Sequence, residues 1–174
     1  MPEARPESGT GRWLALAVLV VVLDQLSKFW VLQSFALHER RPVINGLFDL
    51  TLVFNPGAAF SFLAEHDGWQ RWFFTILGIA AALFIIHLLR RANGMPMYAA
   101  ALSLILGGAV GNVVDRLVHG EVVDFLLFYQ HPWYFPAFNL ADSAITLGAV
   151  LLILDELQRW RRERAQAQRR PAEH

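Results

Sequence analysis

Two aspartates in strongly apolar surroundings are the residues of this sequence best suited to chemistry. Asp124 lies in "VVDFLL", and Asp142 lies in "FNLADSAI" at the start of an apolar run. Two carboxyl groups held close together cannot both ionise, so one keeps a proton while its partner can activate water as a general base. The protonated carboxyl can polarise a carbonyl and stabilise a tetrahedral intermediate. The pair therefore predicts aspartyl hydrolysis, and the residue types alone do not decide which aspartate holds the proton.

Each aspartate also has a purely structural interpretation. Asp124 could form a turn or be solvated, although its apolar neighbours make an ionised carboxylate costly there and favour chemistry. Asn139 could cap the following helix, with Asp142 three residues later in a variant capping box. We favour function for Asp142, because carboxylates within membrane segments tend to mark sites, and both roles could coexist.

The composition indicates that a membrane positions these residues. Of the 174 residues, 55% are hydrophobic and 17% are charged, and the mean hydropathy is +0.37. This is too apolar for an ordinary soluble domain of this size. Four apolar stretches of about 18 to 20 residues each match the thickness of a bilayer core, so we expect four transmembrane helices. They cover residues 13–32, 72–89, 95–114 and 137–154.

The distribution of positive charge predicts the orientation. Ten of the fifteen Lys and Arg residues lie before the first stretch, between the second and third, or after the fourth. The positive-inside rule then places both termini in the cytoplasm and puts Asp124 and Asp142 at the outer, periplasmic face. Residues 1–12 and 161–174 are polar and are expected to be mobile cytoplasmic tails, which leaves 13–160 as a single membrane domain.

The predicted fold class is an all-α membrane protein with a small β-containing subdomain in the periplasmic loop 33–71. Within that loop, "LFDLTLVFN" alternates between apolar and polar residues, which is typical of a strand. The "AAFSFL" stretch at 58–63 could be a second extended segment or a short interfacial helix. Several Trp and Tyr residues near the outer boundary suggest an aromatic belt.

Further polar residues lie within the predicted helices. Asp24 and Lys28 are four residues apart and can pair on one helical face, where the structural interpretation is an ion pair or a lysine that snorkels to the membrane surface. A Ser27–Lys28 catalytic dyad is unlikely, because adjacent helical residues point about 100° apart. Asn112 and Asp115 share a face, where they could orient a neighbouring polar group or form a network at the helix end.

Two glycines in the third stretch, Gly107 and Gly111, form a small-xxx-small pair that would let another helix approach closely.

The sequence contains no cysteine, which excludes disulfides and thiolate metal sites. Its six histidines are scattered without a metal-binding spacing, so we expect no metal. Nucleic-acid binding has no support beyond the basic C-terminal tail, which more simply faces anionic lipid headgroups.

Five short motifs occur in the order found in a known family. They are "DQLSK" from Asp24, "NPGAAFS" from Asn55, "GNVVDR" from Gly111, "VVDF" from Val122 and "FNLADSAI" from Phe138. With these motifs the sequence resembles the bacterial lipoprotein signal peptidases, or signal peptidase II family, from about Trp13 to Leu157. Each motif is weak alone, but five in order with a matching topology are specific.

The resemblance implies a four-helix aspartyl endopeptidase of the bacterial inner membrane that removes signal peptides from prolipoproteins. The substrate would carry a diacylglyceryl-modified cysteine just after the scissile bond, and no metal or organic cofactor would be needed. Globomycin-type compounds would inhibit the enzyme. The family's catalytic dyad falls on Asp124 and Asp142. Its supporting residues fall on Asp24, Lys28, Asn55, Gly111, Asn112, Asp115, Arg116, Asn139 and Ala141.

A second class of function competes with hydrolysis. In a proton-coupled carrier or lipid-binding scaffold, Asp24, Lys28, Asp115 and Asp142 would form a relay. Such a protein would place polar groups near the middle of several helices, whereas these cluster toward one face. We therefore expect a peptidase, acting as a monomer with membrane lipids and a lipidated substrate as its partners.

Overall fold

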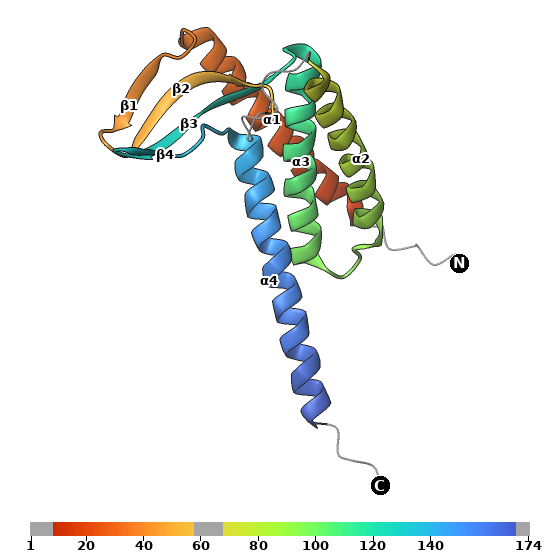
Figure 1. The fold of residues 1–174 in the computed structure, drawn as a ribbon. Helices are drawn as coiled ribbons and strands as arrows, with labels where there is room; N and C mark the ends of the chain where they lie inside the picture. The colour runs from red at the N-terminus through yellow and green to blue at the C-terminus, as the bar shows by residue number, and fades with distance from the viewer. Residues whose placement is uncertain (1–8, 58–67, 170–174) are drawn as a thin grey trace.

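The computed structural model describes residues 9–57 and 68–169, which form four helices and four strands (Figure 1). The four helices pack together as a bundle, and the sheet extends from one end of that bundle. In chain order the elements are α1 (Thr10–Ser34), β1 (Arg40–Ile44), β2 (Phe48–Asn55), α2 (Trp69–Arg91), α3 (Pro96–Val118), β3 (Val122–Gln130), β4 (Trp133–Tyr134) and α4 (Leu140–Arg169).

The helices agree with the four predicted apolar stretches. In the part of the chain that the structure describes, α1, α2 and α3 are long and apolar enough to cross a membrane. The first 18 residues of α4 also hold Asp142, Asp155 and Glu156, so a fourth crossing stays a prediction. Large apolar side chains such as Phe29 and Leu83 point away from the protein with more than half of their surface exposed, which is expected where lipid surrounds the bundle.

The C-terminal half of α4 projects beyond the other helices (Figure 1). Residues 161–174 were expected to be a mobile tail, but the helix continues as far as Arg169. Arg, Glu, Ala and Gln dominate this segment, and all four are strong helix formers, which the polar composition alone did not suggest.

Helix α3 is the centre of the bundle, since it packs against α1, α2 and α4. Gly107 and Gly111 allow the close approach of α1, as their spacing predicted. A Cβ on Gly107 would lie 2.6 Å from the Cβ of Val20, and one on Gly111 would lie 2.5 Å from Oδ2 of Asp24. Even an alanine at Gly111 would therefore displace the carboxylate of Asp24.

The sheet is larger than the sequence predicted. The expected strand forms as β2, but the four-stranded antiparallel sheet, in the order β1-β2-β3-β4, takes β3 and β4 from outside the loop 33–71. The fold is mostly helical, as predicted, but its sheet is not confined to the loop 33–71. Asp124 does not form a turn, because it lies on β3 opposite Val53. The first four residues of β3 are all buried, so β3 lacks the alternation that identified β2. The segment 58–63 lies outside the described residues.

An apolar cluster joins the sheet to the end of α1. Val31 of α1 and Phe35, which directly follows that helix, pack against Leu52 of β2 and against Val123 and Phe125 of β3. The side chains of Val31 and Val123 are fully buried. This cluster holds β3 against the bundle and thereby places Asp124 next to the start of α4.

Candidate active site

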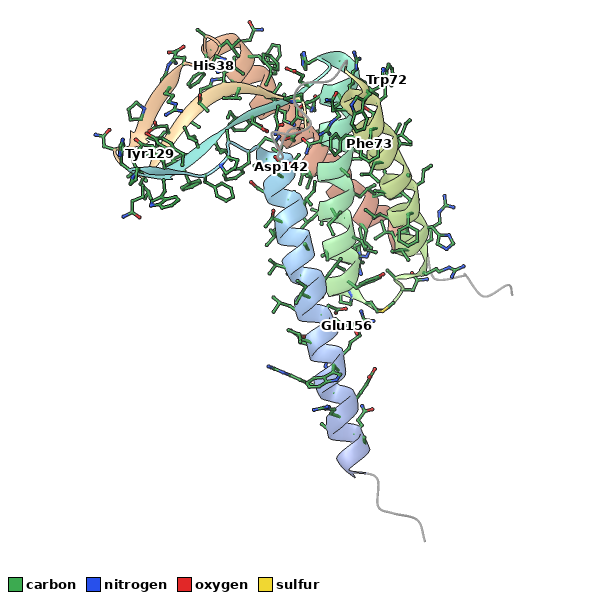
Figure 2. All side chains as sticks on the ribbon, viewed as in Figure 1. His38, Trp72, Phe73, Tyr129, Asp142 and Glu156 are labelled. Carbon is green, nitrogen blue, oxygen red and sulfur yellow. The ribbon has the colours of Figure 1, made fainter. Side chains whose placement is uncertain are left out.

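Asp124 and Asp142 come from different elements and are joined through one residue, Asn139. Asp142 lies in the first turn of α4, where that helix meets the sheet (Figure 2). The Asn139 side chain donates from Nδ2 to Oδ1 of Asp124 at 2.7 Å. Its Oδ1 accepts the backbone N–H of Asp142 at 2.9 Å, and its own N–H donates to Oδ2 of Asp142 at 3.4 Å. The capping box that the sequence suggested is therefore formed, and the same asparagine also binds the second carboxylate.

Both oxygens of Asp124 accept hydrogen bonds from amide side chains. Asn55 donates from Nδ2 to Oδ2 at 2.9 Å, while Asn139 binds Oδ1. The backbone N–H of Gly57 donates to Oδ1 of Asn55 at 2.9 Å, which turns the amide group of Asn55 toward the aspartate. Asp124 is 1% exposed, so the carboxyl group is held rigidly and almost without water.

This environment changes the acidity of Asp124. Burial raises the pKa of Asp124 to about 7, and the negative charge of Asp142 acts in the same direction. Hydrogen bonds from Asn55 and Asn139 oppose the rise, as does the charge of Lys28. Below about pH 7 Asp124 therefore holds a proton, which a pair of aspartates needs if one is to act as an acid.

A third amide side chain orients Asp142. Asn112 of α3 donates from Nδ2 to Oδ1 of Asp142 at 2.7 Å. The Oδ1 atom of Asn112 accepts from Lys28 Nζ and from Asn139 Nδ2, each at 3.2 Å. Because these two donors fix the amide oxygen, the NH₂ group of Asn112 must face Asp142.

The predicted ion pair between Asp24 and Lys28 is present and includes a third member. Lys28 Nζ lies 2.7 Å from Oδ2 of Asp24 and 2.7 Å from Oδ2 of Asp115. All three side chains are at most 2% exposed, so each charge depends on the others for its solvation. The Ser27 hydroxyl donates to the backbone oxygen of Asp24 at 2.7 Å, within its own helix.

The two acidic members of this cluster also bind backbone groups next to Asp142 and Asp124. Oδ1 of Asp24 accepts the N–H of Ala141 at 2.9 Å. Oδ2 of Asp115 accepts the N–H of Val123 at 3.0 Å. The motif residue Ala141 thus contributes its backbone, and its side chain is fully buried.

Arg116 lies at the edge of the cluster. Its Nη1 donates to the backbone oxygen of Asn112 at 3.2 Å, and its guanidinium group lies 5.2 Å from the centre of the Phe74 ring. The charge is within electrostatic reach of Asp142, Asp115 and Asp124. Its Nε is buried and has no hydrogen-bond partner among the described residues.

One site residue was missed from the sequence. Gln25 donates from Nε2 to Oδ1 of Asp115 at 2.8 Å and to Oδ2 of Asp24 at 3.2 Å. A signal existed, since an amide directly beside Asp24 in an otherwise apolar helix needs a partner. All eleven predicted site residues, in contrast, lie in or beside the same hydrogen-bonded cluster. Within residues 9–57 and 68–169, no group of three His, Cys, Asp or Glu residues is placed to hold a metal ion.

A helical membrane fold with two carboxylates joined at one end of the bundle is consistent with an aspartic-type membrane hydrolase. Comparison with known proteins names the family. The sequence profile of the family described as signal peptidase (SPase) II matches residues 16–158. The chain therefore belongs to the signal peptidase II family and is an aspartic-type peptidase.

Relatives and solved structures agree with this assignment. The chain is 60% identical over 154 residues to a lipoprotein signal peptidase of Ralstonia nicotianae, covering 88% of each chain. It is 61% identical over 150 residues to one of Cupriavidus necator, covering 86% of this chain and 85% of the relative. A bacterial membrane enzyme solved at 2.3 Å resolution has a TM-score of 0.75 and 32% identity, over 85% of this chain and 88% of that one. The chain is accordingly a multi-pass bacterial membrane enzyme.

Proposed function

We propose that this chain cleaves the signal peptide from lipid-modified prolipoproteins, with Asp124 and Asp142 as its catalytic dyad. The relatives that share about 60% of its residues are lipoprotein signal peptidases. The single observation that supports the dyad is the link through Asn139, which binds both carboxylates directly. Family membership also favours hydrolysis over the carrier or lipid scaffold that the intramembrane charges allowed.

The raised pKa of Asp124 suggests how the two aspartates divide their roles. With a pKa of about 7, Asp124 is the protonated member near neutral pH and donates to the scissile carbonyl oxygen. Asp142 accepts a proton from water as the oxygen of that water attacks the carbonyl carbon. In the resulting tetrahedral intermediate, Asp142 passes its proton to the leaving nitrogen as the C–N bond breaks. Asp124 then regains a proton from the hydroxyl group that becomes the new carboxyl.

Arg116 is suited to hold the substrate backbone. Its buried Nε has no hydrogen-bond partner among residues 9–57 and 68–169, and packing on Phe74 limits the motion of its guanidinium group. A peptide carbonyl one or two residues from the scissile bond would satisfy this donor. Asn112 is already saturated at its oxygen, so its part is to orient Asp142.

The sheet is suited to grip the rest of the substrate. A cavity of about 560 Å³ lies against it, lined by residues that include His38, Arg40, Tyr134 and Phe135. Exposed aromatic residues also lie at this end of the molecule, among them Trp72 at the start of α2 (Figure 2). We place this end at the periplasmic surface, with both termini in the cytoplasm. There the aromatic rim would contact the signal helix, and buried lipid would contribute about 0.8 kcal/mol per methylene.

The decisive experiment uses the purified full chain with a diacylglyceryl-modified prolipoprotein. Cleavage by the wild type that a globomycin-type compound blocks, and loss of cleavage in Asp124→Asn and Asp142→Asn, would support the proposal. Asp155→Asn is the matched control, because Asp155 pairs with Arg159 on the same helix as Asp142 but far along it. Wild-type turnover by a folded Asp124→Asn protein would refute the dyad.

A further inference from the structure

Gln25 has no part in the mechanism above, although it lies among the buried charges. The side chain belongs to α1, is half-buried, and contacts three groups of the cluster. Its Nε2 lies 2.8 Å from Oδ1 of Asp115, 3.2 Å from Oδ2 of Asp24 and 3.2 Å from the backbone oxygen of Gly111.

The two carboxylates that Gln25 contacts have equivalent positions relative to the dyad. Asp24 accepts the backbone N–H of Ala141, the residue before Asp142. Asp115 accepts the backbone N–H of Val123, the residue before Asp124. Each buried carboxylate therefore holds the chain one residue ahead of one catalytic aspartate.

Two side chains connect these carboxylates to each other. Lys28 Nζ lies 2.7 Å from Oδ2 of both Asp24 and Asp115. Two carboxylates and one ammonium leave one negative charge in excess, so Lys28 alone does not remove the repulsion between them. The amide of Gln25 adds a second bridge, from Oδ2 of Asp24 to Oδ1 of Asp115, without adding charge.

We propose that Gln25 is a positioning residue that sets the separation of the two catalytic aspartates. It holds Asp24 and Asp115 at a fixed distance, and these in turn hold Ala141 and Val123. The proposal rests on the assignment of Asp124 and Asp142 as the dyad. Loss of the amide would leave Lys28 as the single bridge, so that the two carboxylates, and with them the two catalytic residues, move apart.

The test compares Gln25→Met with Gln33→Met in the full-length enzyme acting on a lipidated prolipoprotein. Methionine keeps the length of the side chain but donates no hydrogen bond. Gln33 is the matched control, because it is an exposed glutamine on the same helix. A small misplacement of reacting groups is expected to lower kcat roughly 10- to 100-fold in Gln25→Met, while KM changes by less than about twofold. Gln33→Met should match the wild type in both constants.

A pH profile separates positioning from a merely structural role. Asp124 is faced by the charges of Asp142 on α4, Lys28 on α1 and Arg116 on α3, and Gln25→Met alters none of them. Greater separation would weaken the effect of Asp142 on Asp124, so the upper limb of the kcat/KM profile should move to lower pH. Simple loss of folded protein would lower the whole profile without moving that limb.

The outcomes distinguish this proposal from the assignment of the dyad. A folded Gln25→Met protein with the kcat of the wild type, or with a lower kcat but an unmoved upper limb, overturns the positioning role. If Gln25→Met does not fold, Gln25→Asn is judged by the same two criteria, because its shorter amide cannot span both carboxylates. Turnover by Asp124→Asn would overturn the dyad itself, whatever the Gln25 variants do.

Discussion

The two ends of the helix bundle are built on opposite principles. At the end farther from the sheet, Ile85 and Leu89 of α2 pack with Ala99, Leu102 and Leu106 of α3 in a purely apolar cluster. At the sheet end, Asp24, Lys28 and Asp115 are equally buried but are charged. Apolar packing between membrane helices stabilises by close contact and does not depend on one particular pairing. Buried charges stabilise the fold only when each charge keeps its partner. Substitutions should therefore be tolerated less well at the sheet end than at the far end.

The largest effect expected from this contrast is on catalysis alone. Asp124→Asn keeps the shape of the neutral carboxyl that burial favours and loses one of the two hydrogen bonds that Asp124 accepts, so the protein should fold with a modest loss of stability. Turnover of a lipidated prolipoprotein should fall by roughly 10⁴-fold or more, since the variant cannot donate and regain the proton. Cleavage measured on gels beside a thermal unfolding scan would show activity and stability separating. A comparable fall in stability would mean that Asp124 is mainly structural.

A smaller effect, on both stability and activity, is expected at the centre of the polar end. Lys28→Met would remove the ammonium group that bridges Asp24 and Asp115. Removing one member of a buried ion cluster typically costs about 3–5 kcal/mol. Reversible unfolding in detergent micelles would measure the loss. An unfolding free energy equal to that of the wild type would show that the cluster does not need its ammonium group.

The corresponding change at the apolar end should affect stability only. Leu102 is 2% exposed, and Leu102→Ala should cost about 2 kcal/mol or somewhat more through the cavity left behind. Its kcat should remain that of the wild type, because the cluster lies at the other end of α3 from Asn112 and Asp115. The same unfolding assay and a cleavage assay give both values. A fall in kcat would mean that packing at the far end is transmitted to the dyad.

The unfolding free energy should also depend on pH, and its change per pH unit is the smallest of these effects. The pKa of Asp124 is raised in the folded protein from an ordinary value near 3.8 to about 7. Such a group stabilises the fold fully below pH 4, and that contribution is lost as pH rises toward 7, by at most about 1.4 kcal/mol per pH unit. Unfolding free energies of the wild type and Asp124→Asn, compared between pH 4 and 8, isolate this term. Parallel curves would contradict the raised pKa.

The sequence predicted features within one element better than contacts between elements. Long apolar runs located all four helices, and the i, i+4 spacing predicted the pair of Asp24 and Lys28, because both signals are local. The third member, Asp115, depends on how α1 packs on α3, which spacing within one helix does not reveal. Strand β3 escaped prediction because its early residues are buried on both faces and do not alternate. Gln25 was overlooked because a single amide has no periodicity, even though burial of its donor required a partner.

The capping box at Asn139 has a consequence for the newly made chain. The contacts that begin α4 also place Asp142, and the same asparagine reaches across to Asp124 on β3. If Asp124 and Asp142 form the proposed dyad, a newly inserted chain whose last helix has not yet docked keeps the two carboxylates apart. Peptidase activity would then appear only after α4 has packed against β3.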